Sequence, residues 1–419
     1  MITSLGEAKF SSPLNYSVDD IIRIPASIKV MPGEKHENDL MFELAGPRAR
    51  LFFDPSVTKA GIVTCGGLCP GMNNVIRSLC LELFFIYGVK EIVGFRYGYK
   101  GLDPANGLEP IVLTHSRIDD IHREGGTILG TSRGPVDIKA AVDNLIQQKI
   151  NILFTIGGDG TQKGGFELFK EAQQRNYPLA VVGIPKTIDN DISFVSRTFG
   201  YLTAVEESCR VISMAHVEAS SVEYGISLVK LMGRNAGFIA IGATVANQDV
   251  NFVLIPEVSF ALQGAKGFLQ ALRNRMVDRK HAVIVVAEGA GQDLLAPGAA
   301  RYDVSGNLIL KDIGIFLREQ IGEYFKTEKI PAIMRYFDPS YSIRSCPADA
   351  EDSILCDLYA RNAVHAAMAG KTGLIIGFLH DTFIHVPIDL LMKKSKRVDL
   401  KGWEWRAALA ATGQPEVFE

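Results

Sequence analysis

The sequence lacks a long hydrophobic run, a paired cysteine pattern and a marked net charge. The best candidate for a membrane span, Leu79–Val89, is shorter than the ~20 residues that such a helix needs, and it contains Glu82. The N-terminal residues lack the basic and apolar segments of a secretory signal. Only Cys65 and Cys69 of the six cysteines are close together, with no histidine beside them, which argues against zinc. We therefore expect a cytoplasmic protein with reduced thiols.

The charge balance also excludes some partners. With 44 Lys and Arg against 47 Asp and Glu, the net charge is -3, so neither nucleic acid nor an anionic membrane is expected as a partner. A hydrophobic content of 47% is ordinary for a globular protein, and 419 residues are enough for two domains. Binding of a small anion would have to come from individual basic residues.

From about residue 56, short β-rich apolar runs alternate with amphipathic stretches. Strands are expected at 59–65, 91–96, 150–158, 179–185, 225–233, 251–257 and 281–289, and helices at 72–84, 136–148, 164–175 and 204–219. This alternation predicts an α/β fold with two doubly wound, mostly parallel-sheet, Rossmann-like domains and an active site in the cleft between them. Residues 1–55 are less regular and are expected to form an N-terminal extension.

Two glycine-rich turns are suited to phosphate binding. In "TCGGLCPGMNN", an expected strand runs into Gly66 and Gly67 before a helix opens near Met72. Bare backbone and free helix N–H groups can approach a phosphate there, although many tight turns look alike. In "GGTILGTSRGP", Arg133 could grip a phosphate through two N–H groups, or it could be a solvated loop arginine.

Two further turns carry acids. In "IGGDGT", Asp159 stands at a helix start, where it could hold Mg²⁺ that bridges phosphate oxygens, or cap the helix. In "PKTIDNDI", Asp189 and Asp191 alternate along what we expect to be an extended segment, so both should face the same side. Two neighbouring carboxylates repel each other, which is unfavourable unless they bind a metal, act as a base or pair with cations. The alternative is that both belong to an Asx-rich turn. Lys186 and Thr187 supply donors beside them.

The chain resembles the phosphofructokinases, because eight separated motifs occur in the order of that family. They span roughly residues 58–375 and are "TCGGLCPGMN", "GTSRG", "IGGDGT", "PKTIDND", "KLMGRNAGF", "IPEVSF", "VVAEGAGQD" and "DPSYSIRS". The chain is similar in detail to the longer ATP-dependent subgroup of plants and trypanosomatids, and "DLKGWEWRAALAATGQP" near the C-terminus is of the same type. The resemblance implies a glycolytic kinase that transfers the γ-phosphoryl group of Mg-ATP to the 1-hydroxyl of fructose 6-phosphate.

The resemblance also implies domains and roles. A nucleotide-binding domain would comprise residues 56–200 and about 343–385, and a sugar-phosphate-binding domain 201–342 and about 386–419. Nucleotide ligands would be Gly66, Arg133, Gly134, Gly158, Asp159, Gly160, Thr161 and Lys186, with Asp159 as the Mg²⁺ ligand. The catalytic group would be Asp189 as proton acceptor, Thr187, Arg133 and Arg234. Sugar-phosphate ligands would be Thr187, Ile188, Asp189, Asp191, Met232, Gly233, Arg234, Glu257, Arg335, Tyr341, Ser342, Ile343 and Arg344.

Gly160 bears on the phosphoryl donor. Diphosphate-dependent members of the family typically carry a second aspartate there, and its carboxylate would lie where the α-phosphate of ATP must sit. Two like charges ~4 Å apart in a partly shielded site repel by about 4 kcal/mol, which is several hundredfold in binding. Lys186 occurs with both donors and does not discriminate. We expect ATP as the donor, with diphosphate as the alternative.

Two departures from the short bacterial form concern the 6-phosphate. Gly225 stands where that form has an arginine donated across a subunit interface, and Tyr341 stands where it has a histidine. Arg335 matches the other cross-subunit arginine. The resemblance therefore implies an oligomer, a homotetramer or else a homodimer. The effector-site arginines of the short form cannot be traced onto this chain, so no allosteric residues are assigned.

Other protein classes fit the sequence less well. A dehydrogenase needs a G-x-G-x-x-G fingerprint, which "CGGLCPGMNN" does not supply. Lipid and NAD kinases share "GGDGT" but lack a matching "TIDND" and "MGR". A non-catalytic sensor would be expected to have lost Asp159 or Asp189. The short basic run at 392–397 is expected to be a solvated face, or else to line an effector site.

Overall fold

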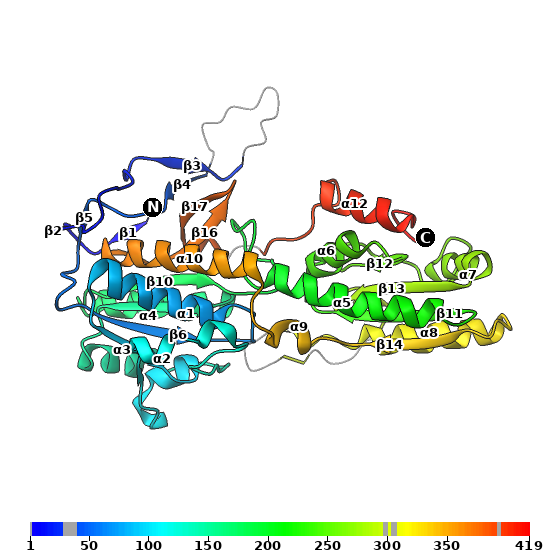
Figure 1. Cartoon of the computed structure of the whole chain (residues 1–419), viewed down its shortest axis with the longest axis horizontal. Helices are drawn as coiled ribbons and strands as arrows, with labels where there is room; N and C mark the ends of the chain where they lie inside the picture. The colour runs from blue at the N-terminus through cyan, green and yellow to red at the C-terminus, as the bar shows by residue number, and fades with distance from the viewer. Residues whose placement is uncertain (1, 28–39, 296–300, 303–307, 392–394) are drawn as a thin grey trace. The chain divides into compact units, whose positions relative to one another are not determined.

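The computed structural model of the chain divides into two compact units (Figure 1). It describes residues 2–27, 40–295, 301–302, 308–391 and 395–419. Unit 1 comprises Met1–Thr187, Ile192–Gly200 and Ser345–Ser395, and unit 2 comprises Ile188–Asp191, Tyr201–Arg344 and Lys396–Glu419. Among the described residues, none of the helices combines the length and apolarity that crossing a bilayer requires.

Unit 1 is built on a nine-stranded mixed sheet in the described part of the chain. Its order is β3 (Arg23–Pro25), β4 (Met41–Leu44), β17 (Thr382–Pro387), β16 (Leu374–Leu379), β10 (Ala180–Pro185), β9 (Ile152–Gly157), β6 (Lys59–Thr64), β7 (Glu91–Phe95) and β8 (Ile111–Val112). The five strands from β16 to β7 are parallel, and the outer strands are antiparallel. Every residue of β9 and β10 is buried, as expected for strands covered on both faces.

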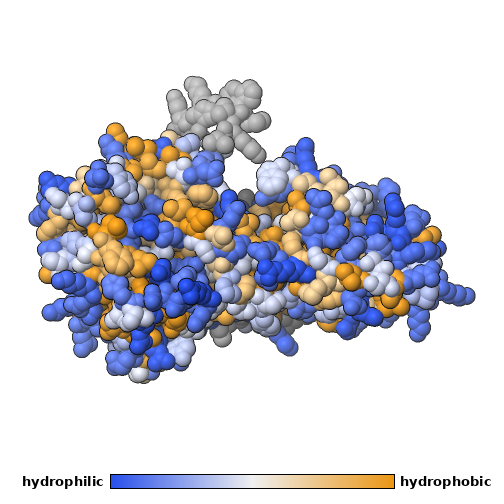
Figure 2. Space-filling view, in the orientation of Figure 1, coloured by the Kyte–Doolittle hydropathy of each residue, from blue (hydrophilic) through white to orange (hydrophobic). Residues whose placement is uncertain are grey.

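Helices cover this sheet on both faces. On one side α1 (Met72–Leu81) packs beside α10 (Ala350–Met368), and on the other α3 (Ile138–Gln147) and α4 (Asp159–Gln174) share a core with β6, β7, β9 and β10. The surface in the region of α1 and α10 mixes hydrophilic and hydrophobic side chains (Figure 2). Ile354 and Leu358 of α10 are exposed. The smaller elements are β1 (Thr3–Ser4), β2 (Phe10–Ser11), β5 (Arg50–Leu51), η2 (Glu82–Tyr87), η3 (Gly98–Leu102), η4 (Pro104–Asn106), α2 (His115–Ile118), η5 (Ile121–Arg123), β15 (Lys371–Thr372) and α11 (Ile388–Leu391).

Unit 2 is built on a four-stranded sheet in which every neighbouring pair is parallel. Its order is β12 (Phe252–Leu254), β13 (His281–Ala287), β11 (Gly225–Leu231) and β14 (Ile333–Phe337). One face carries α5 (Tyr201–Ser220) and α6 (Phe238–Asn247), and the other carries α7 (Phe268–Arg279) and α8 (Ile313–Thr327). The remaining elements are η6 (Gln292–Leu294), α9 (Ser342–Ser345) and α12 (Trp403–Thr412).

The predicted α/β class with two doubly wound sheets is confirmed, with three differences in detail. The first sheet is mainly parallel as expected, but antiparallel strands are added at its edges. The helix expected at 72–84 is α-helical only to Leu81 and continues as the π-helical η2, which ends at Gly88 with φ 74°. The helix expected from 164 begins at Asp159, because glycines of low helix propensity hide its first turn in the sequence.

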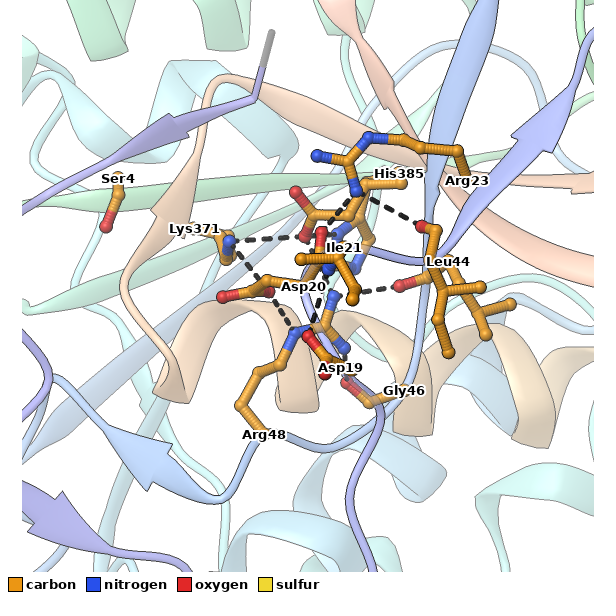
Figure 3. Close-up of polar contacts among 12 residues, drawn as sticks. Ser4, Asp19, Asp20, Ile21, Arg23, Leu44, Gly46, Arg48, Lys371 and His385 are labelled. Atoms are coloured by element: carbon orange, nitrogen blue, oxygen red, sulfur yellow. Dashed lines mark hydrogen bonds and ion pairs between the residues drawn. The ribbon is translucent and has the colours of Figure 1, made fainter.

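Buried ion pairs join the N-terminal residues to the rest of unit 1 (Figure 3). Arg48 donates from Nε to Asp20 at 2.6 Å and from Nη2 to Oε1 of Glu43 at 2.8 Å. Lys371 Nζ lies 3.2 Å from the same Glu43 oxygen, and His385 Nδ1 lies 3.0 Å from it. Strands β3 and β4 extend the sheet beside β17 at this point. Residues that are far apart in the sequence are therefore tied together by one buried carboxylate.

Acid should weaken this cluster. Burial by itself raises the pKa of Glu43, but the hydrogen bond with His385 and the charges of Lys371 and Arg48 outweigh it and lower that pKa from 4.5 to about 2. The unfolded chain binds the proton near pH 4.5 and the folded chain only near pH 2, so this stabilisation is complete above pH 4.5 and is lost as the pH falls toward 2. Urea unfolding at pH 7, 4.5 and 3 should show a loss of about 2 kcal/mol from this group by pH 3.

The matched control for this prediction is Glu43→Gln. It removes the titrating group, so the variant should be less stable at pH 7 and should lack this part of the pH dependence. If the wild type and the variant lost stability equally between pH 4.5 and 3, Glu43 would not be the group responsible.

Candidate active site

Three of the predicted turns lie at one edge of the sheet of unit 1. Gly66 comes just after β6, Gly158 follows β9, and Lys186 follows β10, and these three strands are parallel neighbours. The carboxyl edge of such a sheet is where α/β proteins bind ligands. The structure therefore brings together three segments that the sequence identified separately.

Lys186 and Gly66 lock two of these turns together. The buried Lys186 ammonium donates to the carbonyl of Gly67 at 2.5 Å. Gly66 has φ 84°, and a Cβ at this position would lie 3.3 Å from Lys186 Nζ. Glycine is therefore required here both for the left-handed backbone and for the close approach of the lysine.

The segment that carries Arg133 packs onto the same turn. The Gly66 N–H donates to the carbonyl of Ser132 at 3.1 Å, and the Thr131 hydroxyl donates to the carbonyl of Gly66 at 2.7 Å. Arg133 and Gly134 follow directly and are exposed. The backbone of the predicted phosphate-binding arginine thus lies next to the Gly66 turn.

The stretch Gly157–Thr161 forms the start of α4. A Cβ at Gly157 would meet the Thr161 side chain at 2.1 Å, so the strand-to-helix turn requires glycine. Gly158 is the N-cap, and Asp159 and Gly160 are exposed in the first turn. Asp159 is therefore not the N-cap, which was the alternative for this acid. A Cβ at Gly160 would meet no atom within 4 Å, so the space beside Asp159 is open.

Asp159 offers a single carboxylate. This suits a magnesium ion whose other ligands are phosphate oxygens of a bound substrate and water. Among the described residues, no three His, Cys, Asp or Glu side chains are grouped so that they could hold a metal. Mg²⁺ is commonly bound by one or two carboxylates together with phosphate oxygens and water. One exposed carboxylate in the first turn of a sixteen-residue helix fits that pattern.

Two residues that sequence reasoning missed hold this turn in shape. Gln162 is buried, and its Nε2 donates to the carbonyl of Gly157 at 2.9 Å and to that of Ile184 at 3.3 Å. The Tyr99 hydroxyl donates to the carbonyl of Thr161. Gln162 directly follows the quoted "IGGDGT" motif, but nothing in the sequence shows that its side chain bonds to the ends of two strands.

The "TIDND" segment turns instead of running straight. Asn190 has φ 53°, a left-handed conformation that asparagine tolerates because of its short polar side chain. The expectation that Asp189 and Asp191 lie on one extended segment is therefore wrong, and their alternation no longer places them on the same side. Thr187 is in unit 1, where its carbonyl accepts from the Thr198 hydroxyl at 2.7 Å. Asp189 and Asp191 are half-buried and belong to unit 2.

The predicted sugar-phosphate segments of unit 2 also follow parallel strands. Met232 comes after β11, with Gly233 at φ 139° and Arg234 at φ 47°. The Arg234 N–H donates to the Glu288 carboxylate at 2.9 Å. Glu288 follows β13 and lies in a quoted motif, but the sequence analysis gave it no role. It fixes the turn that carries Arg234.

Glu257 is held at the start of α6. Both of its carboxylate oxygens lie 3.1 Å from the N–H of Gly237, the N-cap of that helix, and Oε1 also accepts from the N–H of Val398 at 3.0 Å. A carboxylate is stabilised at a helix N-terminus by the free N–H groups and the dipole. Glu257 is thus fixed in position before any substrate binds.

Most of the remaining predicted sugar-phosphate residues lie on β14, on α9 or directly before α9. Arg335 is exposed and pairs with Glu218 of α5, with 3.5 Å between Nε and Oε2. The Arg344 guanidinium lies 4.9 Å from the centroid of the exposed Tyr341 ring. Ile343 is fully buried, so only its backbone is available to a ligand. Ile188 is also buried.

The basic run at 392–397 is not simply a solvated face. Residues 392–394 lie outside the described part of the chain. Lys396 is half-buried, and its ammonium lies 4.9 Å from the centroid of the Phe238 ring. Burial lowers the pKa of Lys396 to about 8. The expectation of a solvated face is therefore wrong for this residue.

Comparison with known proteins gives one consistent family. The family profile described as Phosphofructokinase matches residues 59–367. The chain is 45% identical to the ATP-dependent 6-phosphofructokinase of Borreliella burgdorferi, covering 99% of this chain and 96% of that protein. It is 44% identical to ATP-dependent 6-phosphofructokinase 1 of Arabidopsis thaliana (98% and 87%) and 47% identical to the ATP-dependent 6-phosphofructokinase of Trypanosoma brucei brucei (88% and 75%). A solved pyrophosphate-dependent phosphofructokinase of Marinobacter aquaeolei has a TM-score of 0.71 at 18% identity, covering 86% of this chain and 93% of that one.

Proposed function

The chain belongs to the phosphofructokinase family, and from this premise we propose that it is an ATP-dependent 6-phosphofructokinase. It transfers the γ-phosphoryl group of ATP to the 1-hydroxyl of D-fructose 6-phosphate and releases fructose 1,6-bisphosphate and ADP. The observation that carries the proposal is the identity to ATP-dependent relatives along nearly the whole chain. The open space at Gly160 supports ATP over diphosphate, because the residue after Asp159 has no side chain and a Cβ there would meet no atom within 4 Å.

The donor is held by the turns of unit 1. The backbone of the Gly66 turn and of Gly158–Thr161 offers N–H groups to the phosphates, at the positive end of the α4 dipole. Lys186 holds two of these turns together through its bond to Gly67. Asp159 would hold Mg²⁺, which would neutralise charge on the phosphate oxygens.

The "TIDND" segment supplies the group that takes the proton from the sugar. Asp189 accepts the proton of the 1-hydroxyl, with Thr187 adjacent in the chain. Because phosphoryl transfer passes through a loose transition state, the proton leaves late and Asp189 need not be a strong base. Arg133 and Arg234 neutralise the charge on the transferred group.

The sugar phosphate is bound by residues of unit 2. Glu257 binds a sugar hydroxyl, and Arg335, Tyr341 and Arg344 bind the 6-phosphate. The other contacts come from Ile188, Asp191, Met232, Gly233, Ser342 and Ile343. The cation–π contact between Arg344 and Tyr341 limits the freedom of that arginine before the phosphate arrives.

Assaying both donors tests the proposal. The purified protein should form fructose 1,6-bisphosphate with Mg-ATP, and kcat/KM with Mg-diphosphate should be at least ~10²-fold lower, since the site accepts a nucleotide without a second carboxylate beside Asp159. Product would be measured by coupling to aldolase, with EDTA in a parallel sample to remove Mg²⁺. Faster turnover on diphosphate would contradict the choice of donor, and no product with either donor would contradict the activity.

We also propose that the enzyme is a homotetramer, with a homodimer as the alternative, and that it works in the cytoplasm. The exposed Arg335 on β14 supports a contact with a neighbouring subunit, and the exposed Ile354 and Leu358 supply apolar surface for association. All six cysteines are thiols, which suits a reducing compartment. A monomer in sedimentation equilibrium at assay concentration would contradict the oligomer.

A further inference from the structure

A short C-terminal segment, Lys396–Val398, bonds to two predicted active-site elements of unit 2. The Lys396 N–H donates to the carbonyl of Asp191 at 2.8 Å. Two residues later, the Val398 N–H donates to Oε1 of Glu257 at 3.0 Å. One segment therefore joins the turn that carries Asp189 to the carboxylate predicted to bind the sugar.

The Lys396 side chain reinforces the same connection. Its ammonium lies 4.9 Å from the centroid of the ring of Phe238, the first residue of α6. The carboxylates of Glu404 and Asp191 are the charges that act on it. Because Gly237, directly before Phe238, donates to Glu257, the lysine lies beside the helix start that positions Glu257. A half-buried ammonium this close to an aromatic ring is attracted to the face of that ring.

The positive charge of Lys396 can act on the carboxylates of the Asp189–Asp191 turn. Asp191 is a second carboxylate in the turn of Asp189, and phosphoryl transfer brings further negative charge to that region. Like charges at short range repel each other strongly in a partly shielded site. The Lys396 ammonium offsets the charge of Asp191 and leaves the carboxylate of Asp189 to interact with the acceptor hydroxyl.

We propose that Lys396 is a positioning residue for phosphoryl transfer, which fixes the Asp189–Asp191 turn and, through the segment Lys396–Val398, the Glu257 carboxylate. This inference rests on the proposed function, since the reaction defines what is being positioned. It assigns a role in the reaction to a C-terminal segment in which the sequence analysis placed no site residue.

Lys396→Met is the test, because methionine keeps an unbranched side chain over Phe238 and removes only the charge. We expect kcat to fall about tenfold, since a displaced catalytic group reacts less often. KM for fructose 6-phosphate should rise severalfold and KM for ATP should change little, because the ATP residues lie in unit 1. Lys396→Arg should restore most of kcat. Lys401→Met is the matched control, because it removes a charge from an exposed lysine shortly after this segment and should leave both constants unchanged.

Hydrogen exchange of the full-length protein without substrate separates this inference from the proposed function. The amides of residues 188–191 should exchange faster in Lys396→Met than in the wild type or in Lys401→Met. An inactive wild type would overturn the proposed function, and the exchange difference would still show whether Lys396 holds the turn. An active wild type with Lys396→Met unchanged in kcat and in exchange would overturn the inference. If Lys396→Met does not fold, Lys396→Gln gives the same decision, because it also removes the charge and its amides at 188–191 should exchange faster than those of the wild type.

Discussion

Replacing Asp189 by serine should lower kcat at least ~10²–10⁴-fold while the fold persists. Serine cannot take the proton of the acceptor hydroxyl, and the lost interaction forms only as the phosphoryl group transfers. KM for fructose 6-phosphate and for ATP should therefore change much less than kcat. The substitution removes a half-buried carboxylate from a turn outside both sheets, so the thermal midpoint should stay close to that of the wild type.

Asp191→Asn is the control for Asp189→Ser. Both variants remove one negative charge from the same turn, and the Asp191 carbonyl that accepts from Lys396 is retained in the control. If Asp189 is the base, Asp191→Asn should keep far more activity than Asp189→Ser. The reverse order, or near-normal turnover in Asp189→Ser, would mean that the base is misassigned.

Gly160→Asp should lower kcat/KM for ATP several hundredfold. A second carboxylate beside Asp159 would lie in the path of the nucleotide phosphates, and like charges ~4 Å apart repel by about 4 kcal/mol. The side chain itself fits, because nothing lies within 4 Å of a Cβ at this position. Position 160 is also in the first turn of α4, where an acid is favoured by the helix dipole, so folding should be unaffected.

Gly160→Ala is the matched control for this substitution. It adds a Cβ in the same open space without a charge, so ATP kinetics should stay within a few fold of the wild type. Activity with diphosphate should not fall in Gly160→Asp, because diphosphate has no α-phosphate and nucleoside to displace. If alanine and aspartate reduced ATP use equally, bulk rather than charge would be the cause.

The sequence alone predicted the fold class and the positions of the main turns. The apolar runs that became β6, β9 and β10 are short and rich in β-branched residues, and each ends in a turn with the glycine or polar residues that such a strand end requires. Local composition determines these features, because strand burial and backbone freedom are properties of neighbouring residues. The starts and ends of helices were less accurate, since the glycines before α4 weaken the pattern that marks a helix.

The sequence also predicted the roles of some single residues and missed those of others. The order of eight motifs was enough to predict the family, and the roles of Asp189, Arg234 and Glu257 stay predictions that the experiments above test. Sequence reasoning gave Glu288 and Gln162 no role, because their hydrogen bonds reach backbone groups on other segments. A hydrogen bond between distant segments leaves no repeating pattern in the sequence from which it could be predicted.

Only the tertiary structure decided what surrounds the predicted turns. The left-handed backbone of Asn190 bends the segment that carries Asp189 and Asp191, which we expected from the sequence to be extended. Lys396, expected to be solvated, lies against Phe238 and bonds through its N–H to Asp191. Glu43 bonds to the nearby Arg48 and to Lys371 and His385 from a distant part of the chain. The partners of Lys396 and most partners of Glu43 are far apart in sequence, and the free energy of such contacts depends on burial and distance, which exist only once the chain has folded.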